Sequence, residues 1–174
     1  MRGHYQILIP LLSLLLVRVD LTDLFPLKYP VQVLEILDGD TLVVGINQRR
    51  IKLRLSRIDA PEKGQPFLHE RGDAGAESKK CLAAQLKKLP HLIISIEGYD
   101  IYKRTLGDLS GLSFKLVQNG CSSLYPHAVF QSREEKSQYM RALTRAKSKR
   151  LGLWAQGGFM TPKIWRKSHR HQRK

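Results

Sequence analysis

Cysteine is scarce in this sequence, and the spacing of the two cysteines argues against a zinc site and against a disulfide framework. Among 174 residues there are two cysteines, Cys81 and Cys121, with no CxxC pair and no cysteine–histidine pair at zinc spacing. A zinc site is therefore not expected. Two cysteines also do not imply the disulfide framework of a small secreted domain. We expect two small buried side chains, although the two could pair in an exported protein.

Long hydrophobic runs are also missing. The N-terminal apolar run, residues 7–17, is interrupted by Pro10 and Ser13 and is shorter than the ~20 apolar residues of a membrane-spanning helix. Its length, and Arg2 before it, are typical of a secretory signal, although no small-x-small cleavage site follows. We therefore predict that residues 1–28 are a signal peptide or an uncleaved anchor, and that the protein is secreted, periplasmic or membrane-anchored. The alternative is an N-terminal element packed on a cytoplasmic domain.

Acidic residues are half as numerous as basic ones, 15 against 30, which makes the formal net charge +15. Such an excess indicates a polyanionic partner, nucleic acid first and an anionic membrane surface second. A merely soluble basic surface is the plainer alternative. The length and the hydrophobic content of 42% suit one globular domain. We assign that domain to residues 29–156, expect a monomer, and expect the basic tail, residues 157–174, to be solvated and disordered.

The patterns along the domain predict short strands first and helices later. Alternating or branched apolar residues predict five strands, at 31–37, 41–46, 51–58, 92–99 and 105–109. Helical patterns cover 74–89, with Asp73 as N-cap, then 111–118 and 132–150. Five short strands with a helix between the third and the fourth predict an α+β fold, a five-stranded OB-fold β-barrel with about three helices.

One stretch of this basic chain, residues 34–62, concentrates acidic side chains: Asp38, Asp40, Asp59 and Glu62. Asp40 and Asp59 stand at the ends of neighbouring predicted strands, where their oxygens could serve one hard cation such as calcium. The cation would neutralise a phosphate oxygen and orient a phosphodiester substrate.

Three further residues complete this chemistry. Glu62 follows Asp59 closely enough to act as general base on a nearby water. Arg54, which the strand alternation places on the face away from the core, and Arg104 could each donate two hydrogen bonds to a phosphate. Each residue also has an ordinary alternative, since Asp-Gly-Asp is a common turn sequence and an arginine on an exposed strand face is usually solvated. Their joint occurrence favours the catalytic interpretation.

Five segments carry a resemblance to a known family. They are Val33–Thr41 (VLEILDGDT), Arg54–Glu62 (RLSRIDAPE), Tyr102–Gly107 (YKRTLG), Val117–Gly120 (VQNG) and Gly152–Trp154 (GLW). In order and spacing the sequence resembles the thermonuclease family, the staphylococcal-type nucleases. The resemblance implies an OB-fold barrel with three helices that hydrolyses phosphodiester bonds in DNA and RNA. It also implies calcium as the cofactor, little sequence specificity, and products with 3′-phosphate ends.

The resemblance assigns roles residue by residue. Asp40 and Asp59 match the calcium-ligand aspartates, and Asp38 matches a nearby acidic position that supports the site. Ala60 matches a position that offers its backbone carbonyl to the metal, where other members often have threonine. Glu62 matches the proposed general base, a role that is debated.

The remaining matches concern the substrate. Arg54 and Arg104 match the two arginines that contact the scissile phosphate, and Tyr102 matches a substrate-contacting tyrosine. Lys103 stands where a glycine often precedes the second arginine, and it could add a phosphate contact. Tyr125 lies near the place of a base-stacking tyrosine.

Two other functions remain open from the sequence. A non-catalytic OB-fold module would bind nucleic acid without cleaving it, but the retained acids and arginines argue against it. A protein of the membrane surface would use the apolar N-terminus and the basic tail, and it would leave the acidic cluster without a use.

Overall fold

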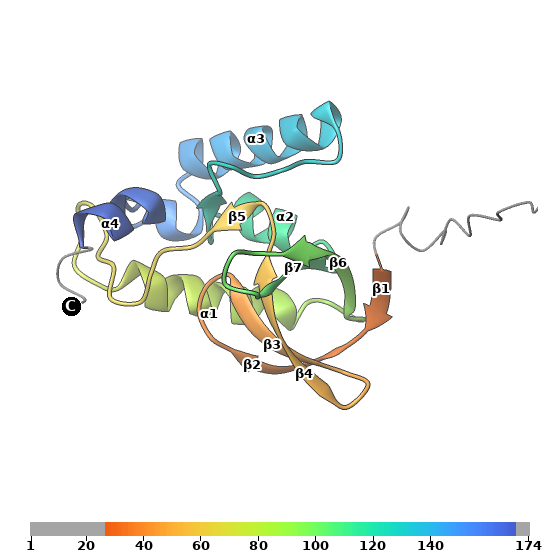
Figure 1. Cartoon of the computed structure of the whole chain (residues 1–174). Helices are drawn as coiled ribbons and strands as arrows, with labels where there is room; N and C mark the ends of the chain where they lie inside the picture. Colours follow the sequence, from red (N-terminus) through yellow and green to blue (C-terminus); the bar gives the residue numbers. More distant parts are fainter. Residues whose placement is uncertain (1–26, 170–174) are drawn as a thin grey trace, which may run out of the picture.

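The computed structural model describes residues 27–169 and shows a curled six-stranded sheet with helices around it (Figure 1). The strand order is β1-β6-β7-β4-β3-β2, and the neighbours are antiparallel except for the parallel pair β4 and β7. A separate short pair joins β5 and β8. The strands are β1 (Leu27–Pro30), β2 (Gln32–Ile36), β3 (Thr41–Ile46), β4 (Arg49–Leu55), β5 (Ile58–Asp59), β6 (Ile93–Tyr99), β7 (Thr105–Leu109) and β8 (Ser123–Leu124).

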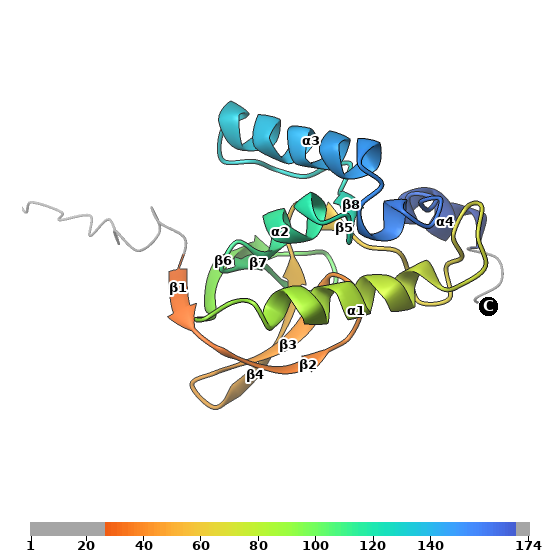
Figure 2. The same cartoon turned by 180° about the vertical axis from the view of Figure 1, so that it is seen from behind.

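Within residues 27–169, four α-helices and one 3-10 helix accompany the sheet (Figure 2). Helix α1 lies along the sheet, α2 packs between α1 and α3, and α4 lies near the N-terminal end of α1. The helices are α1 (Ala74–Leu86), α2 (Leu112–Gln118), α3 (Arg133–Ser148), the 3-10 helix η2 (Gly152–Trp154) and α4 (Pro162–Ser168).

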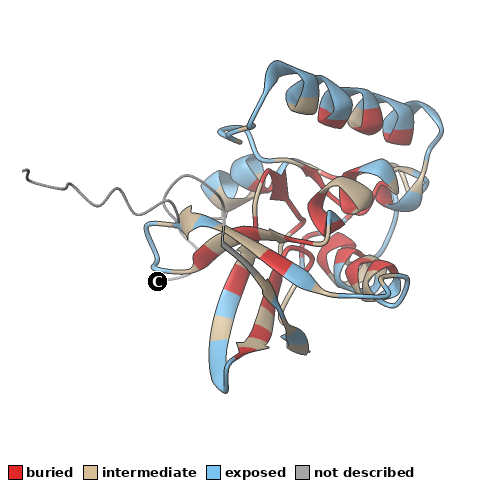
Figure 3. Cartoon of the chain, turned by 90° about the vertical axis from the view of Figure 1, so that its right-hand side faces the viewer, coloured by how far each residue is buried: buried red, intermediate tan, exposed pale blue. Residues whose placement is uncertain are grey.

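The core fills the space between the concave face of the sheet and helices α1 and α2 (Figure 3). Every second side chain of β4 points into it, so that Leu53 and Leu55 are fully buried. They join Leu42 of β3, Leu82 of α1 and Leu116 of α2 in one apolar cluster. Each such buried leucine stabilises the fold by roughly 1.5–3 kcal/mol. The opposite face of β4 is therefore available for polar side chains.

The α+β, OB-fold class predicted from the sequence is confirmed, and the strand count differs slightly. Strand β7 has the predicted bounds, and Asp73 caps α1 by accepting a hydrogen bond from the Ala76 amide at 3.0 Å. The predicted strand 51–58 already ends at Leu55, because Arg57 adopts a positive φ of 68° that no strand accommodates. Strands β5 and β8 were not predicted, since two residues show no periodicity.

The C-terminal tail, predicted to be disordered, contains a helix in its described part. Helix α4 begins at the buried Pro162, a residue type suited to the first helical turn. Before it, Phe159 stacks on Trp154 with ring centres 4.7 Å apart and pairs through its backbone with Phe67. Composition alone indicated disorder, whereas these tertiary contacts hold the segment on the domain.

The predicted signal or anchor, residues 1–28, lies almost wholly outside the described residues. Between residues 27 and 169, no helix combines the length and the apolar character that crossing a bilayer requires.

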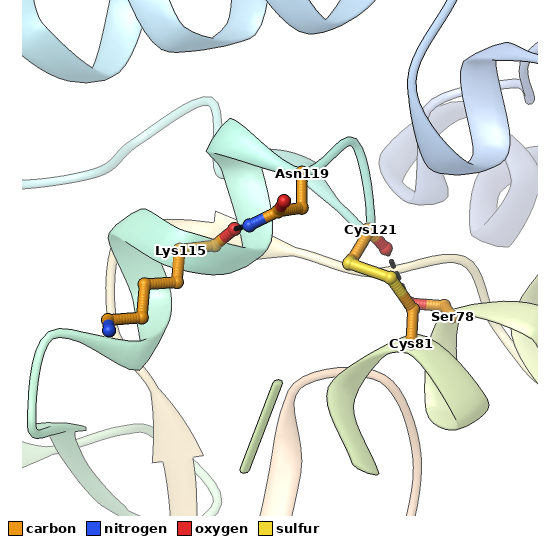
Figure 4. The surroundings of a disulfide bond; sticks show 5 residues. All are labelled: Ser78, Cys81, Lys115, Asn119 and Cys121. Carbon is orange, nitrogen blue, oxygen red and sulfur yellow. Dashed lines mark hydrogen bonds between the residues drawn. A yellow bond between two sulfur atoms is a disulfide. The ribbon is translucent and has the colours of Figure 1, made fainter. Parts of the chain in front are cut away.

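Cys81 of α1 and Cys121, just after α2, form a disulfide with their Cα atoms 5.7 Å apart (Figure 4). Our expectation of two separate side chains was wrong, because only the packing of α1 against α2 brings residues 40 positions apart together. Next to the bond, the Ser78 hydroxyl donates a hydrogen bond to the Cys121 carbonyl at 2.7 Å. The disulfide thus reinforces the contact of the two helices at one place.

The turn that precedes β3 packs tightly against α1. A Cβ atom at Gly39 would overlap the Ser78 hydroxyl and would stand 2.7 Å from the Cβ of Ala60. Only glycine therefore allows the Asp38–Asp40 turn to approach both α1 and the segment after β5.

Replacing both cysteines with serine should lower the free energy of unfolding by about 2–4 kcal/mol, because the unfolded chain would regain the entropy of an open 40-residue loop. Urea denaturation followed by circular dichroism measures the loss. A reducing agent should reproduce it in the unmodified protein and leave the double variant unaffected. Equal midpoints for the oxidised protein and the double variant would contradict the prediction.

Gly39→Ala should destabilise the protein by about 1–3 kcal/mol, the usual cost of forcing a methyl group into a packed contact. The matched control is Gly45→Ala in β3, where the new methyl would meet Leu34 at an ordinary 3.5 Å. Thermal denaturation compares the two variants. A loss at Gly39 no greater than at Gly45 would show that the turn can move away from α1.

Candidate active site

Two acidic residues from different strands meet at one edge of the sheet. Asp40 directly precedes β3, and Asp59 is the last residue of β5. The Asp38 side chain accepts the Asp40 amide at 3.0 Å, which shapes the turn. The Asp40 carboxylate then accepts the Ala60 amide at 2.7 Å. This bond ties the turn before β3 to the segment that carries Asp59.

Arg54 lies between the two aspartates. Its Nη2 is 3.1 Å from Asp40 Oδ2 and 3.1 Å from Asp59 Oδ1. Its Nη1 donates to the carbonyls of Leu55 and Ile58 at 2.8 and 3.0 Å. The side chain leaves the core face of β4 as the sequence predicted, yet it is only 11% exposed because these partners surround it. The two carboxylates therefore point at the same guanidinium nitrogen.

Burial makes it harder for Asp40 and Asp59 to ionise. It raises the pKa of Asp40 to about 7, with Arg54 opposing the shift and Asp38 and Asp59 adding to it. Burial also raises the pKa of Asp59, against the lowering influence of Arg166 and Arg54. Desolvation disfavours a charged carboxylate, and a nearby cation restores it. The pair therefore carries more negative charge than its surroundings stabilise well, a condition that favours binding of a cation.

Glu62 lies beside Asp59 and shares a partner with it that sequence reasoning missed. Arg166 of α4 places Nη1 2.6 Å from Glu62 Oε1 and Nη2 3.1 Å from Asp59 Oδ2. The Glu62 amide donates to the Gln65 side chain at 3.1 Å. In the sequence, Arg166 is one of several basic tail residues, and no signal distinguishes it from the others.

Arg104 approaches the site from the loop between β6 and β7. Asp100 accepts its Nε at 2.7 Å and its backbone amide at 2.9 Å. The guanidinium carbon is 5.6 Å from the ring centre of Tyr102. Lys103 beside it has a φ of 58°, in the region that favours glycine. Arg104 is thus paired with Asp100 of its own loop, and not with Asp40 or Asp59.

One cleft of about 1050 Å³ joins these groups. Exposed Tyr99 and Tyr102 lie on its rim, while the exposed Lys103 beside them does not line it. The structure brings the other predicted site residues together around this cleft: Asp38, Asp40, Arg54, Asp59, Ala60, Glu62, Tyr102, Arg104 and Tyr125. Arg166 lines it as well.

The donor chemistry suits a hard divalent cation. In the described part of the chain, residues 27–169, no three acidic, histidine or cysteine side chains gather at one point. Two carboxylates facing one cationic nitrogen are nevertheless present, with Ala60 between the acids Asp59 and Glu62 in sequence. Calcium accepts carboxylate, carbonyl and water oxygens in flexible geometry. The residues therefore fit such an ion, provided that backbone and water complete its shell.

The sequence is similar to a known protein family and to several nucleases. Residues 52–156 match the model of a family described as "Staphylococcal nuclease homologue". An "Uncharacterized endonuclease" of Haemophilus influenzae is 32% identical over 92% of this chain and 85% of its own length. A "Micrococcal nuclease" of Shigella flexneri is 29% identical over 80% and 82%. The "Probable endonuclease LCL3" of Saccharomyces cerevisiae is 31% identical over 70% of this chain and 47% of its own length.

The family match covers more than half of the chain, and the Haemophilus relative spans nearly all of it. The OB-fold sheet agrees with the family match. The chain therefore belongs to the staphylococcal nuclease homologues, a family of phosphodiester-hydrolysing nucleases.

Proposed function

We propose that this nuclease uses one calcium ion to hydrolyse phosphodiester bonds of DNA and RNA, with little sequence specificity and with 3′-phosphate products. The convergence of Asp40 and Asp59 on a single cationic nitrogen is the observation that carries the proposal. The two carboxylates lie in a cleft that Glu62 and Arg104 also line, which supports the assignment of a cation to this pair. The net charge of +15 would draw a polyanion toward these carboxylates.

Asp40, Asp59 and the Ala60 carbonyl are the groups that we assign to the ion. Bound there, calcium would supply positive charge to the oxygens of a neighbouring phosphate. Asp38 supports the site through its hydrogen bond to the Asp40 amide, because that bond fixes the direction in which the Asp40 side chain leaves the backbone.

The chain's own residues supply the remaining chemistry. We assign to Glu62 the removal of a proton from the attacking water, whose oxygen then bonds to phosphorus as the 5′-oxygen leaves. Arg104 would donate hydrogen bonds to the phosphate, and Arg54, whose terminal nitrogens already contact the aspartates and two carbonyls, would stabilise it through its positive charge. Arg104 already donates a hydrogen bond from Nε to Asp100. We therefore assign the two terminal nitrogens of Arg104 to the phosphate.

The substrate contacts would come from the rim of the cleft. Tyr102 is 74% exposed and Tyr125 39% exposed, a state in which aromatic rings can stack on unpaired bases. Lys103 would add a backbone-phosphate contact that reads no sequence. Stacking of this kind would accept single-stranded DNA and single-stranded RNA alike, since every base has a face on which an aromatic ring can stack.

We also propose that the protein works outside the cytoplasm, secreted, periplasmic or held at a membrane by its N-terminus. The Cys81–Cys121 disulfide supports this location, because disulfides persist in oxidising compartments and are rare in the cytosol.

Glu62→Gln and Arg104→Ala should each lower the rate of cleavage roughly 10²-fold, since the first removes the base and the second a phosphate donor. The assay incubates the purified protein with single-stranded DNA and with RNA in calcium, with and without a chelator. The chelator should abolish cleavage by the unmodified protein.

The matched control is Arg141→Ala, which removes the same charge from the exposed face of α3, where Arg141 bonds to Ser137. It should cleave like the unmodified protein. Binding of DNA without cleavage in calcium would instead identify a non-catalytic OB-fold module. Full activity of both site variants would show that the roles belong to other residues.

If the protein is exported, it should be found outside the cytoplasm of the cell that makes it. Fractionation of the native host, followed by N-terminal sequencing, should recover the chain outside the cytoplasm, either processed or held in the membrane fraction. An intact Met1 on protein from the soluble cytoplasmic fraction would reject the location.

A further inference from the structure

The ion pairs of Arg166 bear directly on the proposed metal site. Arg166 comes from α4, beyond the segment that the family model matches. Its guanidinium forms a fork across two acids, with contacts to Asp59 Oδ2 at 3.1 Å and to Glu62 Oε1 at 2.6 Å. These are the carboxylates to which we assign cation binding and proton removal. A basic side chain of the C-terminal segment thus covers the catalytic acids.

Both oxygens of Asp59 already have arginine partners. Arg54 contacts Oδ1 and Arg166 contacts Oδ2. A divalent cation binds a carboxylate oxygen at about 2.3–2.6 Å, a distance that leaves no room for a guanidinium on the same side of that oxygen. An ion that approaches Asp59 on a side already taken by one of these arginines can bind only if that arginine moves.

The surroundings of the two arginines decide which one moves. Arg54 is 11% exposed, belongs to a central strand and donates to two backbone carbonyls beside it. Arg166 is 39% exposed, and the hydrogen bonds found for its guanidinium go to Asp59 and Glu62. Arg166 is the more exposed of the two arginines and holds only carboxylates in these bonds, whereas removing Arg54 would also leave two carbonyl groups without their donor.

Helix α4 is built so that it can follow this movement. It is seven residues long and carries Arg166 near its C-terminal end. Its N-terminal end is anchored, because Pro162 is buried and the Gln65 side chain donates to the Met160 carbonyl. The end that bears Arg166 can therefore tilt while the start of the helix stays attached.

We propose that Arg166 is an internal counter-ion, which neutralises Asp59 and Glu62 before the metal arrives and which the divalent cation displaces, shifting α4 away from the cleft. This inference rests on the proposed function, because it concerns the same metal site. It adds a role for the C-terminal segment: the affinity for the metal is set by competition with a side chain of the protein. It also keeps Glu62 paired until the ion is bound.

Calcium titration by calorimetry on the full chain tests the competition directly. Arg166→Ala should bind calcium about 5- to 10-fold more tightly than the unmodified protein, since the side chain that competes for Asp59 and Glu62 is gone; this factor corresponds to about 1–1.4 kcal/mol. The matched control is Lys167→Ala, which removes one charge from the neighbouring exposed position of α4. It should change the affinity less than twofold.

Equal or weaker calcium binding by Arg166→Ala would overturn the proposal, and so would an equal gain in the Lys167 control. If Arg166→Ala does not fold, as judged by circular dichroism, Arg166→Lys replaces it. Lysine keeps the charge but loses the two-pronged contact, so tighter calcium binding is expected there too, by a smaller factor.

A second measurement needs no change at Arg166. Trp165 stacks on His169 within and just after α4, with ring centres 3.5 Å apart, and the chain has one other tryptophan, Trp154. In a Trp154→Phe background, the emission of Trp165 should change as calcium is added, with the midpoint found by calorimetry. Emission that stays constant at saturating calcium would overturn the movement of α4.

The unmodified protein separates the failure of this inference from that of the proposed function. If it neither binds calcium nor cleaves DNA, the proposed function fails and the inference fails with it. If it binds and cleaves while Arg166→Ala shows unaltered affinity, only the inference fails.

Discussion

The cleft that contains Asp40 and Asp59 depends on one constraint: two buried carboxylates must be held close together. Asp40 and Asp59 are almost inaccessible to water, and unpaired charges in such a place would oppose folding. Arg54 meets the need by placing one nitrogen 3.1 Å from each. Burial still raises the pKa of both acids. Arg54 therefore offsets part of the cost of burying the pair, and Arg166 adds a second partner for Asp59.

The rest of the fold keeps this edge rigid. The leucines of β3 and β4 anchor one side of the sheet in the core, so the polar face of β4 is held in register. Gly39 lets the Asp38–Asp40 turn press against α1, and the Cys81–Cys121 disulfide locks α1 to the end of α2. Neither feature touches a substrate. Both limit the movement of the aspartates, on which the proposed geometry for a metal ion depends.

The C-terminal segment connects this rigid edge to a more exposed part of the molecule. Helix α4 is short, and its Arg166 contacts Asp59 and Glu62, while Arg54 of β4 contacts Asp59 from the opposite oxygen. The two arginines differ in burial and in backbone anchoring, although both carry the same charge. In the proposed exchange, an incoming cation would displace the more exposed Arg166, while Arg54 stays in place.

Local sequence determined the five longer strands, helices α1 to α3, the cap at Asp73 and the acids of residues 34–62, because periodicity and turn chemistry are properties of neighbouring residues. The matching motifs also singled out Arg54 and Arg104, and the family and its fold followed. Only the tertiary structure decided the disulfide, the near-complete burial of Arg54 and the position of Arg166 over Asp59 and Glu62. These features join residues 40 or more positions apart, or depend on how other elements cover a side chain. A basic tail looks the same in sequence whether one of its arginines enters the cleft or all of them face water.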